Sequence, residues 1–319
     1  MSANERVGWS GVGWDDWTDL DLIRAHLDAG ADPDSGVPLH VGPLHAAAKH
    51  GSPEVVTELA RRVDDVDAQG EGRTALWQAV FANRPDNARV LVDAGADPWL
   101  PMMGGWSPGR LSLAGLTPNL FPVPPGQAGL FAAEIEAVAE SRRLIAALGK
   151  LYVEGTGLAC VAGIAAAEAA RRLSAAPVEE SELDELGYDD NDESILTVGI
   201  TDVPGGCVVS QPWAYGPQMP RVMKLLSAGT VCYGLFANPK SGNQGSIARD
   251  GVIEGGVLRP GGGHPSPDDS ANEILASFLY RYKAVAYCCA YAGLRLTNAA
   301  AVNGSPDMWV RLPDGDYWH

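Results

Sequence analysis

The chain has 319 residues, about twice the size of a typical domain, so its length predicts two compact units. Apolar residues make up 46% of the chain and charged residues 20%, a balance that excludes global disorder. The formal net charge of −17 argues against binding to nucleic acid or to an anionic membrane, so we expect a protein partner, and a basic one.

The pattern of apolar residues and cysteines predicts a cytoplasmic location. Residues 1–17 contain no apolar run followed by a small-residue cleavage site, and no apolar window is long enough to span a bilayer. The five cysteines are an odd and scattered set, unlike the framework of a disulfide-rich secreted domain. They also lack the paired spacing of a zinc site, so we expect no metal.

A short motif recurs along the first third of the chain. The sequence Ala-Gly-Ala-Asp-Pro at 29–33 returns at 94–98, and Asp-Val-Asp at 65–67 lies midway between the two copies. The copies are spaced by 32 or 33 residues. A fixed period of this length is typical of a solenoid of stacked helical hairpins.

A second motif keeps the same period. Gly-Pro-Leu-His-Ala-Ala at 42–47 is followed 32 residues later by Thr-Ala-Leu-Trp-Gln-Ala at 74–79, and Ser-Pro at 107–108 falls 33 residues further on. These motifs resemble the helix-opening signature of the ankyrin-repeat family over about 17–114. The resemblance implies an α-helical ankyrin-repeat solenoid over 17–115, after an N-terminal arm at 1–16. It also makes His45 a structural hydrogen-bonding residue rather than a catalytic one.

The third hairpin of the solenoid, 99–106, is the predicted protein-binding surface. Ankyrin hairpins project into solvent, and this one is apolar where the preceding tip is polar. Aromatic and methionine side chains are enriched at binding hot spots. The alternative is that the hairpin packs inside the protein, against the linker or the C-terminal domain. The predicted protein-binding residues are Trp99, Leu100, Met102, Met103 and Trp106, with Gln69 and Asp34 from the earlier turns.

A proline-rich segment at 116–130 interrupts the helical pattern and predicts a linker. We expect a second domain over 131–319, which begins with a helix at 131–151 and continues with a shorter one at 165–173.

Residues 179–193 contain nine acidic residues and no basic residue, and predict a solvated loop. The alternatives for this acidic loop are attraction of a basic partner and, less favoured because the ligand spacing is wrong, calcium binding.

The remaining sequence predicts an α+β domain with an antiparallel sheet. Strands are expected at 194–201, 206–211 and 230–236, and Asp250-Gly251 is a two-residue hairpin signal. A long helix is predicted over 272–294, capped by Asp269 or Ser270. Small residues with a cysteine at 157–161 and Glu-Ala-Ala-Arg-Arg-Leu at 168–173 resemble an uncharacterised actinobacterial domain family over about 151–298, which implies a fold but no activity.

Three features of the sequence resemble parts of enzyme active sites. The segment 234–241 resembles a phosphate-binding loop, but Pro239 replaces a required glycine, so we expect no nucleotide cofactor. His264, Ser266 and Asp269 are sequence neighbours without the geometry of a catalytic triad. The adjacent Cys288 and Cys289 have no basic neighbour to activate a thiol.

The sequence therefore predicts a non-catalytic interaction protein without cofactors, with an immunity protein, an antitoxin and a regulatory protein as the candidate roles. The alternative is a hydrolase or a small-molecule-binding protein whose site lies in the C-terminal domain. In that case the candidate ligand-binding residues are Trp213, Tyr215 and His264.

Overall fold

The chain forms two compact units in the computed structural model, which describes residues 8–37, 42–179, 182–183, 192–261, 263 and 265–318. The first unit comprises Met1–Glu136 together with Pro265–Leu279, and the second comprises Ala137–His264 together with Tyr280–His319. The proline-rich segment 116–130 lies within the first unit. The division into independently folding domains stays a prediction.

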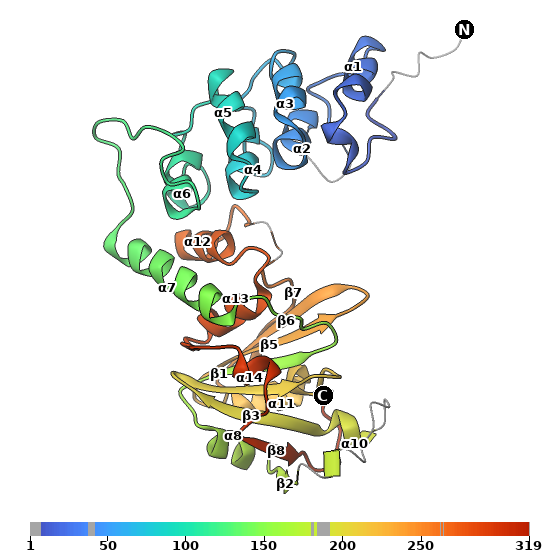
Figure 1. The fold of residues 1–319 in the computed structure, drawn as a ribbon, viewed down its shortest axis with the longest axis vertical. Coiled ribbons are helices and arrows are strands. Elements are labelled where there is room, and N and C mark those ends of the chain that lie inside the picture. The colour runs from blue at the N-terminus through green and yellow to red at the C-terminus, as the bar shows by residue number, and fades with distance from the viewer. Residues whose placement is uncertain are drawn as a thin grey trace. The chain divides into compact units, whose positions relative to one another are not determined.

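The first unit is a stack of short helices arranged as successive hairpins (Figure 1). Helix α2 pairs with α3, and α4 pairs with α5, as the repeat pattern predicts. The elements are η1 (Asp16–Thr18), α1 (Leu20–Asp28), α2 (Pro43–His50), α3 (Pro53–Ala60), α4 (Ala75–Phe81), α5 (Pro85–Asp93), η2 (Met103–Gly105), α6 (Pro108–Ala114) and α12 (Ala271–Leu279), and α7 (Ala132–Leu148) begins in this unit.

Proline and hydroxyl residues fix where these helices begin. Pro43 and Pro108 occupy the first turn, where a missing backbone donor costs nothing. The side chains of Ser52, Thr74 and Ser107 each accept a hydrogen bond from the backbone three residues on and so cap α3, α4 and α6. The residues from Ala75 to Phe81 are all buried, so α4 is a core helix of the stack.

The second unit is built on an eight-stranded sheet with the order β2-β8-β3-β4-β1-β5-β6-β7, and all of its described pairings are antiparallel. This confirms the predicted α+β class. The strands are β1 (Gly157–Ala162), β2 (Ala176–Val178), β3 (Thr197–Val203), β4 (Gly206–Gln211), β5 (Val231–Asn238), β6 (Gly242–Arg249), β7 (Val252–Leu258) and β8 (Met308–Arg311).

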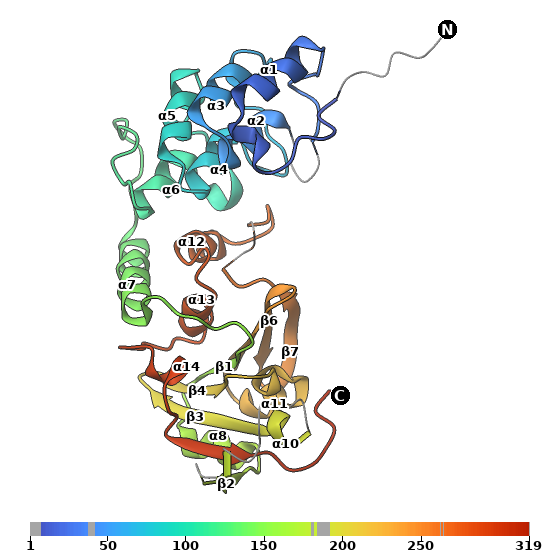
Figure 2. The same cartoon turned by 45° about the vertical axis from the view of Figure 1, so that its right-hand side comes forward.

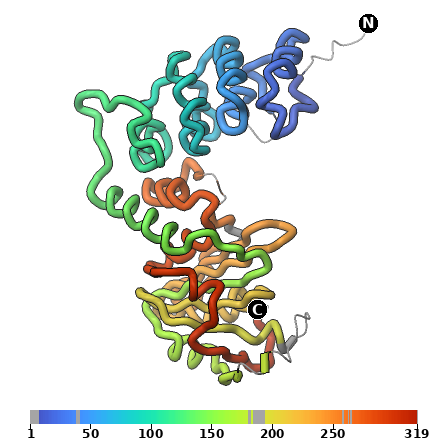
Figure 3. Tube along the Cα trace, in the orientation of Figure 1, coloured from blue at the N-terminus to red at the C-terminus, as the bar shows by residue number. Residues whose placement is uncertain are grey.

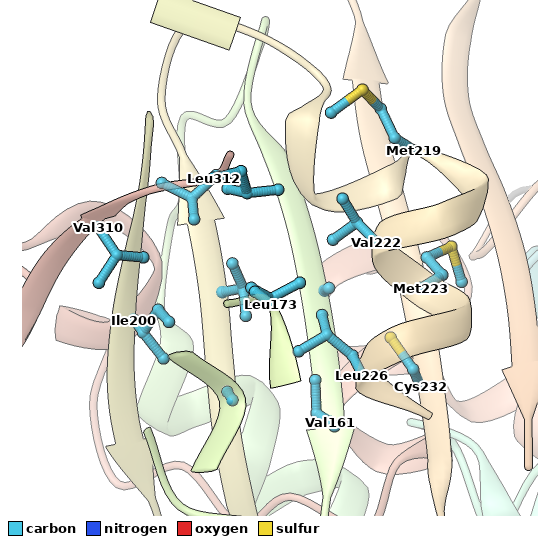
Figure 4. Close-up of a cluster of buried hydrophobic side chains, with 14 of the residues drawn as sticks. Val161, Leu173, Ile200, Met219, Val222, Met223, Leu226, Cys232, Val310 and Leu312 are labelled. Carbon is cyan, nitrogen blue, oxygen red and sulfur yellow. The ribbon is translucent and has the colours of Figure 1, made fainter. Parts of the chain in front are cut away.

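Helices pack against both faces of this sheet (Figure 2). Figure 4 shows one of the two cores, in which Val222 and Leu226 of one helix and Leu173 lie over the strands. On the opposite face, Cys160 of β1 lies against Cys289. The helices of this unit are α8 (Ala166–Arg172), α10 (Asp192–Ile195), η3 (Gly216–Gln218), α11 (Pro220–Leu226), α13 (Ala284–Tyr291), α14 (Ala300–Asn303) and the remainder of α7.

The predicted hairpin at Asp250-Gly251 is confirmed. It joins β6 to β7, and both residues have positive φ, 49° and 79°. A two-residue turn with this backbone matches the right-handed twist of the strands, and aspartate followed by glycine suits it because glycine adopts positive φ without a steric penalty.

The single helix predicted over 272–294 is wrong. The chain forms two helices, α12 and α13, and residues 280–283 between them are not helical. Tyr282 has a φ of 60°, and its backbone nitrogen donates to the carbonyl of Gly261 instead of to a helical carbonyl. Continuous apolar periodicity concealed this break because both helices bury one face.

Candidate functional site

The turns between the helical hairpins share one hydrogen-bonded shape. The first aspartate of each turn accepts a bond from the backbone nitrogen two residues on. These bonds join Asp32 to Asp34, Asp65 to Asp67, and Asp97 to Trp99, at 2.9, 2.9 and 2.8 Å. Aspartate stabilises such a turn because its short side chain reaches its own backbone. The recurring motif in the sequence is therefore a recurring turn.

The second aspartate of two turns joins neighbouring repeats. The Asp34 carboxylate accepts from the Asp64 nitrogen at 3.2 Å, and the Asp67 carboxylate accepts from the Asp97 nitrogen at 2.9 Å. Burial, together with the charges of Asp65 and Asp97, raises the pKa of Asp67. Asp34 thus has a structural role while it remains exposed. Trp99 occupies the position in the third turn that corresponds to Asp34 and Asp67. It has no carboxylate, so it cannot accept the equivalent hydrogen bond from a following turn.

His45 links its helix to the next hairpin. Its Nε2–H donates to the carbonyl oxygen of Arg73 at 3.1 Å, and the ring is buried. Burial lowers the pKa of His45, so the ring is neutral at neutral pH. This geometry is that of a structural histidine.

The second hairpin ends in a tight polar tip. Gly70 and Arg73 exchange backbone hydrogen bonds across the tip, and the two residues between them, Glu71 and Gly72, have positive φ. Gln69, one of the predicted binding residues, is exposed beside this tip. It is accessible to a partner, and its role in binding stays a prediction.

The third hairpin is less exposed than its sequence predicts. Trp106 is fully buried and Met103 is 5% exposed, so the expectation of an exposed hairpin is wrong for these two residues. Trp99, Leu100 and Met102 are half-buried. The Trp99 ring lies against Gly109, where an added Cβ would come within 3.0 Å of the ring.

A segment from the C-terminal half of the sequence, 265–279, packs against the third hairpin, so part of the hairpin makes the internal contacts that the sequence left open as the alternative. Figure 3 traces this segment back to the repeats, and Figures 1 and 2 both show α12 next to α6. Trp106 Nε1 donates to the carbonyl oxygen of Ala271 at 2.9 Å. The Phe278 ring packs on Phe81 of α4, with ring centroids 5.7 Å apart.

Two sequence signals could have identified this segment as a docking helix. Ser270 and Glu273 form a reciprocal capping box: the Ser270 nitrogen donates to Glu273 Oε2 at 2.8 Å and the Glu273 nitrogen to Ser270 Oγ at 3.3 Å. Ile274 and Phe278, four residues apart, lie on one helix face and are both buried. The predicted cap at Ser270 is thereby confirmed.

The turns of the stack present a row of acidic side chains. This acidic row consists of Asp32, Asp34, Asp64, Asp65 and Asp97, all of which are exposed. Their backbone bonds fix the positions of four of them, so negative charge is held at a regular spacing of one or two carboxylates per turn. A fixed row of carboxylates attracts a complementary basic surface.

Trp213 and Tyr215, two of the ligand-binding residues predicted in the second unit, have different aromatic neighbours. Trp213 donates from Nε1 to the carbonyl of Ser194 at 3.0 Å and stacks on Trp309. Tyr215 instead packs between Phe236 and Trp318. His264 lies outside the described residues. A small-molecule site at these residues stays a prediction.

A pocket of about 190 Å³ does occur in the second unit, away from Trp213 and Tyr215. The end of α7, the segment after it and the start of α13 line the pocket, and its titratable groups are Lys150, Tyr282 and Lys283. The described residues that line the pocket include neither a carboxylate nor a histidine to act as a general acid or base. Among the described residues, no three His, Cys, Asp or Glu side chains are grouped as metal ligands require.

The five cysteines are free thiols and all are buried. Sγ of Cys160 and Sγ of Cys289 are 3.6 Å apart, and this hydrogen bond, with burial, raises the pKa of Cys160. Burial raises the pKa of Cys207 to about 12. Thiols that are inaccessible to solvent are poor nucleophiles, so these cysteines serve as core residues. The part of the chain that the structure describes has no helix that is long and apolar enough to cross a membrane.

A comparison with protein families agrees with the geometry of the first unit. The model for ankyrin repeats, in three copies, matches residues 16–101. The N-terminal region therefore consists of ankyrin repeats, which generally mediate protein–protein interaction through the extended surface of the stack. No curated protein matches the chain. The resemblance of 151–298 to an uncharacterised actinobacterial family stays a hypothesis.

Proposed function

We propose that this protein is a non-catalytic interaction module that binds a basic protein along the turns of its ankyrin repeats. The observation that carries the proposal is the acidic row, whose carboxylates are exposed and held in place by the repeat architecture. The formal net charge of −17 adds a long-range field of the same sign. The candidate biological roles are immunity protein, antitoxin and regulatory protein.

The acidic loop, 179–193, is a second source of attraction for a basic partner, although most of it lies outside the described residues. Its nine carboxylates act at a distance, whereas the acidic row forms part of a folded surface. The acidic loop and the acidic row therefore predict different effects on the binding kinetics. The loop increases the association rate, whereas the row also lowers the dissociation rate.

The first test is capture of a partner from a lysate of the native host on the full-length chain, followed by mass spectrometry. We expect a specific basic protein that is eluted by salt. Recovery of no specific macromolecule under several salt conditions would contradict the proposal.

The second test separates charge from structure. The triple variant Asp32→Asn, Asp65→Asn and Asp97→Asn removes three charges, and each amide oxygen can still accept the turn hydrogen bond. We expect weaker partner binding and a smaller dependence of the affinity on salt, with an unchanged melting temperature. The matched control is Glu136→Gln, Asp250→Asn and Asp314→Asn, which removes three charges elsewhere. Equal losses in both variants would show that net charge, not the row, attracts the partner.

Replacing the nine acids of the acidic loop by serine or asparagine completes the series. We expect a slower association rate that falls less steeply with added salt, while the dissociation rate is retained. An unchanged salt dependence would assign this loop to solubility alone.

A further inference from the structure

The segment 265–279 belongs to the first unit, although it lies far outside the ankyrin repeats in the sequence. It is separated from α6 by the whole intervening sequence of the second unit, and its helix has only nine residues. Isolated helices of this length are marginal in water, so most of the stability of α12 comes from its contacts with the repeats. In this respect α12 resembles a bound peptide more than a repeat.

Two buried side chains anchor this segment on the repeats. Ile274 and Phe278 lie against glycines, because a Cβ added at Gly104 would be 2.8 Å from Ile274 Cδ1 and one added at Gly115 would be 3.2 Å from the Phe278 ring. The Trp106 indole supplies a polar contact at the start of the helix, to the carbonyl of Ala271.

The receiving surface has the features of a helix-binding groove. The absence of side chains at Gly104 and Gly115 leaves room for the two anchors, and Phe81 supplies an aromatic wall. Trp106 donates from a fully buried position, so its direction is fixed by packing. We define this helix groove by Phe81, Gly104, Trp106 and Gly115.

We infer that the helix groove is a binding site for an amphipathic partner helix, and that 265–279 is its intramolecular occupant, which the partner must displace. The partner helix carries an aliphatic residue and an aromatic residue four positions apart, as Ile274 and Phe278 are, so that both point into the groove. This inference rests on the proposed function and specifies one surface and one class of ligand for it.

Competition between the tethered segment and an external helix for the helix groove determines how far external binding is weakened. A tethered segment competes at an effective concentration on the order of 1 mM. If the same segment bound as a free peptide with a Kd of about 100 μM, the tethered copy would weaken external binding about 10-fold. The groove is then closed to weak ligands and open to a partner that binds more tightly.

The probe is a fluorescently labelled peptide with the sequence of residues 265–279, titrated into the full-length protein and followed by anisotropy. We compare the unaltered chain with the variant Ile274→Asp and Phe278→Asp, which removes both anchors of the tethered copy. We expect the variant to bind the peptide at least 10-fold more tightly. A peptide that carries the same two aspartates should bind neither protein.

The control variant is Asn272→Asp and Ser277→Asp, which adds the same charge to α12 and keeps both anchors. We expect it to bind the peptide as weakly as the unaltered chain. If the anchor variant remains folded by circular dichroism and binds the peptide no better than the control, the inference is overturned.

Hydrogen exchange provides a second arm in case the anchor variant does not fold. In the unaltered chain, an excess of the unlabelled peptide should raise the exchange rate of amides in α12 and leave those in α13 unchanged. The peptide with two aspartates should have no effect. Absence of any change at a peptide concentration of several mM would also overturn the inference. Neither the peptide titration nor the hydrogen-exchange experiment requires the host partner. A negative result in these two experiments can therefore be distinguished from a failure to capture a partner from the lysate.

Discussion

The indole nitrogen of Trp106 donates a 2.9 Å hydrogen bond to the carbonyl oxygen of Ala271, 165 residues further along the chain. This bond connects the third ankyrin hairpin to the segment that occupies the helix groove. Replacing Trp106 with phenylalanine removes the donor and keeps an aromatic ring, and we expect the free energy of unfolding to fall by about 1–2 kcal/mol. Urea denaturation measures this loss. Trp318→Phe, at a 58% exposed tryptophan, is the control and should cost less than about 0.5 kcal/mol.

The ion pair between Arg110 and Glu134 is the most buried of the described salt bridges that join different elements of the first unit, with side chains 10% and 12% exposed. Arg110 donates to both carboxylate oxygens at 2.7 Å, and its guanidinium also lies over the Trp106 ring. Glu134→Gln leaves the guanidinium buried without a counter-charge, so we expect a loss of about 3 kcal/mol by chemical denaturation. Glu136→Gln changes an exposed residue of the same helix and should be nearly neutral. Equal effects would show that the pair adds nothing specific.

Stability of the first unit should fall as the pH is lowered through about 6.5, the ordinary pKa of histidine. Burial lowers the pKa of His45 in the folded state, so the unfolded chain binds the proton more readily and protonation favours unfolding. The effect is complete below the folded-state pKa. His45→Gln can still donate to the Arg73 carbonyl but does not titrate, so the slope of melting temperature against pH between 7 and 5 should become shallower. His26→Gln is the comparison, and an identical slope in both variants would refute the assignment.

Gly251, in the turn between β6 and β7, should tolerate substitution less well than Gly256 in β7. Gly251 has a φ of 79°, where an L side chain is strained although there is room for it, and Gly251→Ala should cost about 1 kcal/mol or more. Gly256→Ala, in a strand position with open space around it, should cost nothing or stabilise slightly. Thermal unfolding monitored by circular dichroism compares the two. A larger loss for Gly256→Ala would show that the turn does not limit stability.

Trp99, Leu100 and Met102 form the half-buried part of the third hairpin, beside the acidic row. If the partner covers this edge, Trp99→Ala should weaken its binding by about 2 kcal/mol, roughly 30-fold, because buried tryptophans are common hot spots. Isothermal titration measures the affinity. A large drop in melting temperature with unchanged affinity would instead make Trp99 a packing residue of the stack.

The sequence by itself determined the elements whose physical cause is local. The repeating aspartates predict the turns because each side chain bonds to its own backbone two residues on, and the Pro and Ser or Thr residues predict the starts of helices for the same local reason. Asp250-Gly251 predicted a hairpin because two adjacent residues specify its turn. The acidic character of the turns also follows directly from the sequence.

Only the tertiary structure decided which segments lie together. The central strand β1 is rich in alanine and glycine, which have low strand propensity, and it forms because β4 and β5 flank it on both sides. Helix α12 packs on the repeats rather than continuing into α13 because Tyr282 turns the chain there, a backbone choice that apolar periodicity does not encode. The contacts of Trp106 with Ala271 and of Phe81 with Phe278 likewise join distant parts of the sequence, and hydrophobic burial carries no signal of which distant partner will supply it.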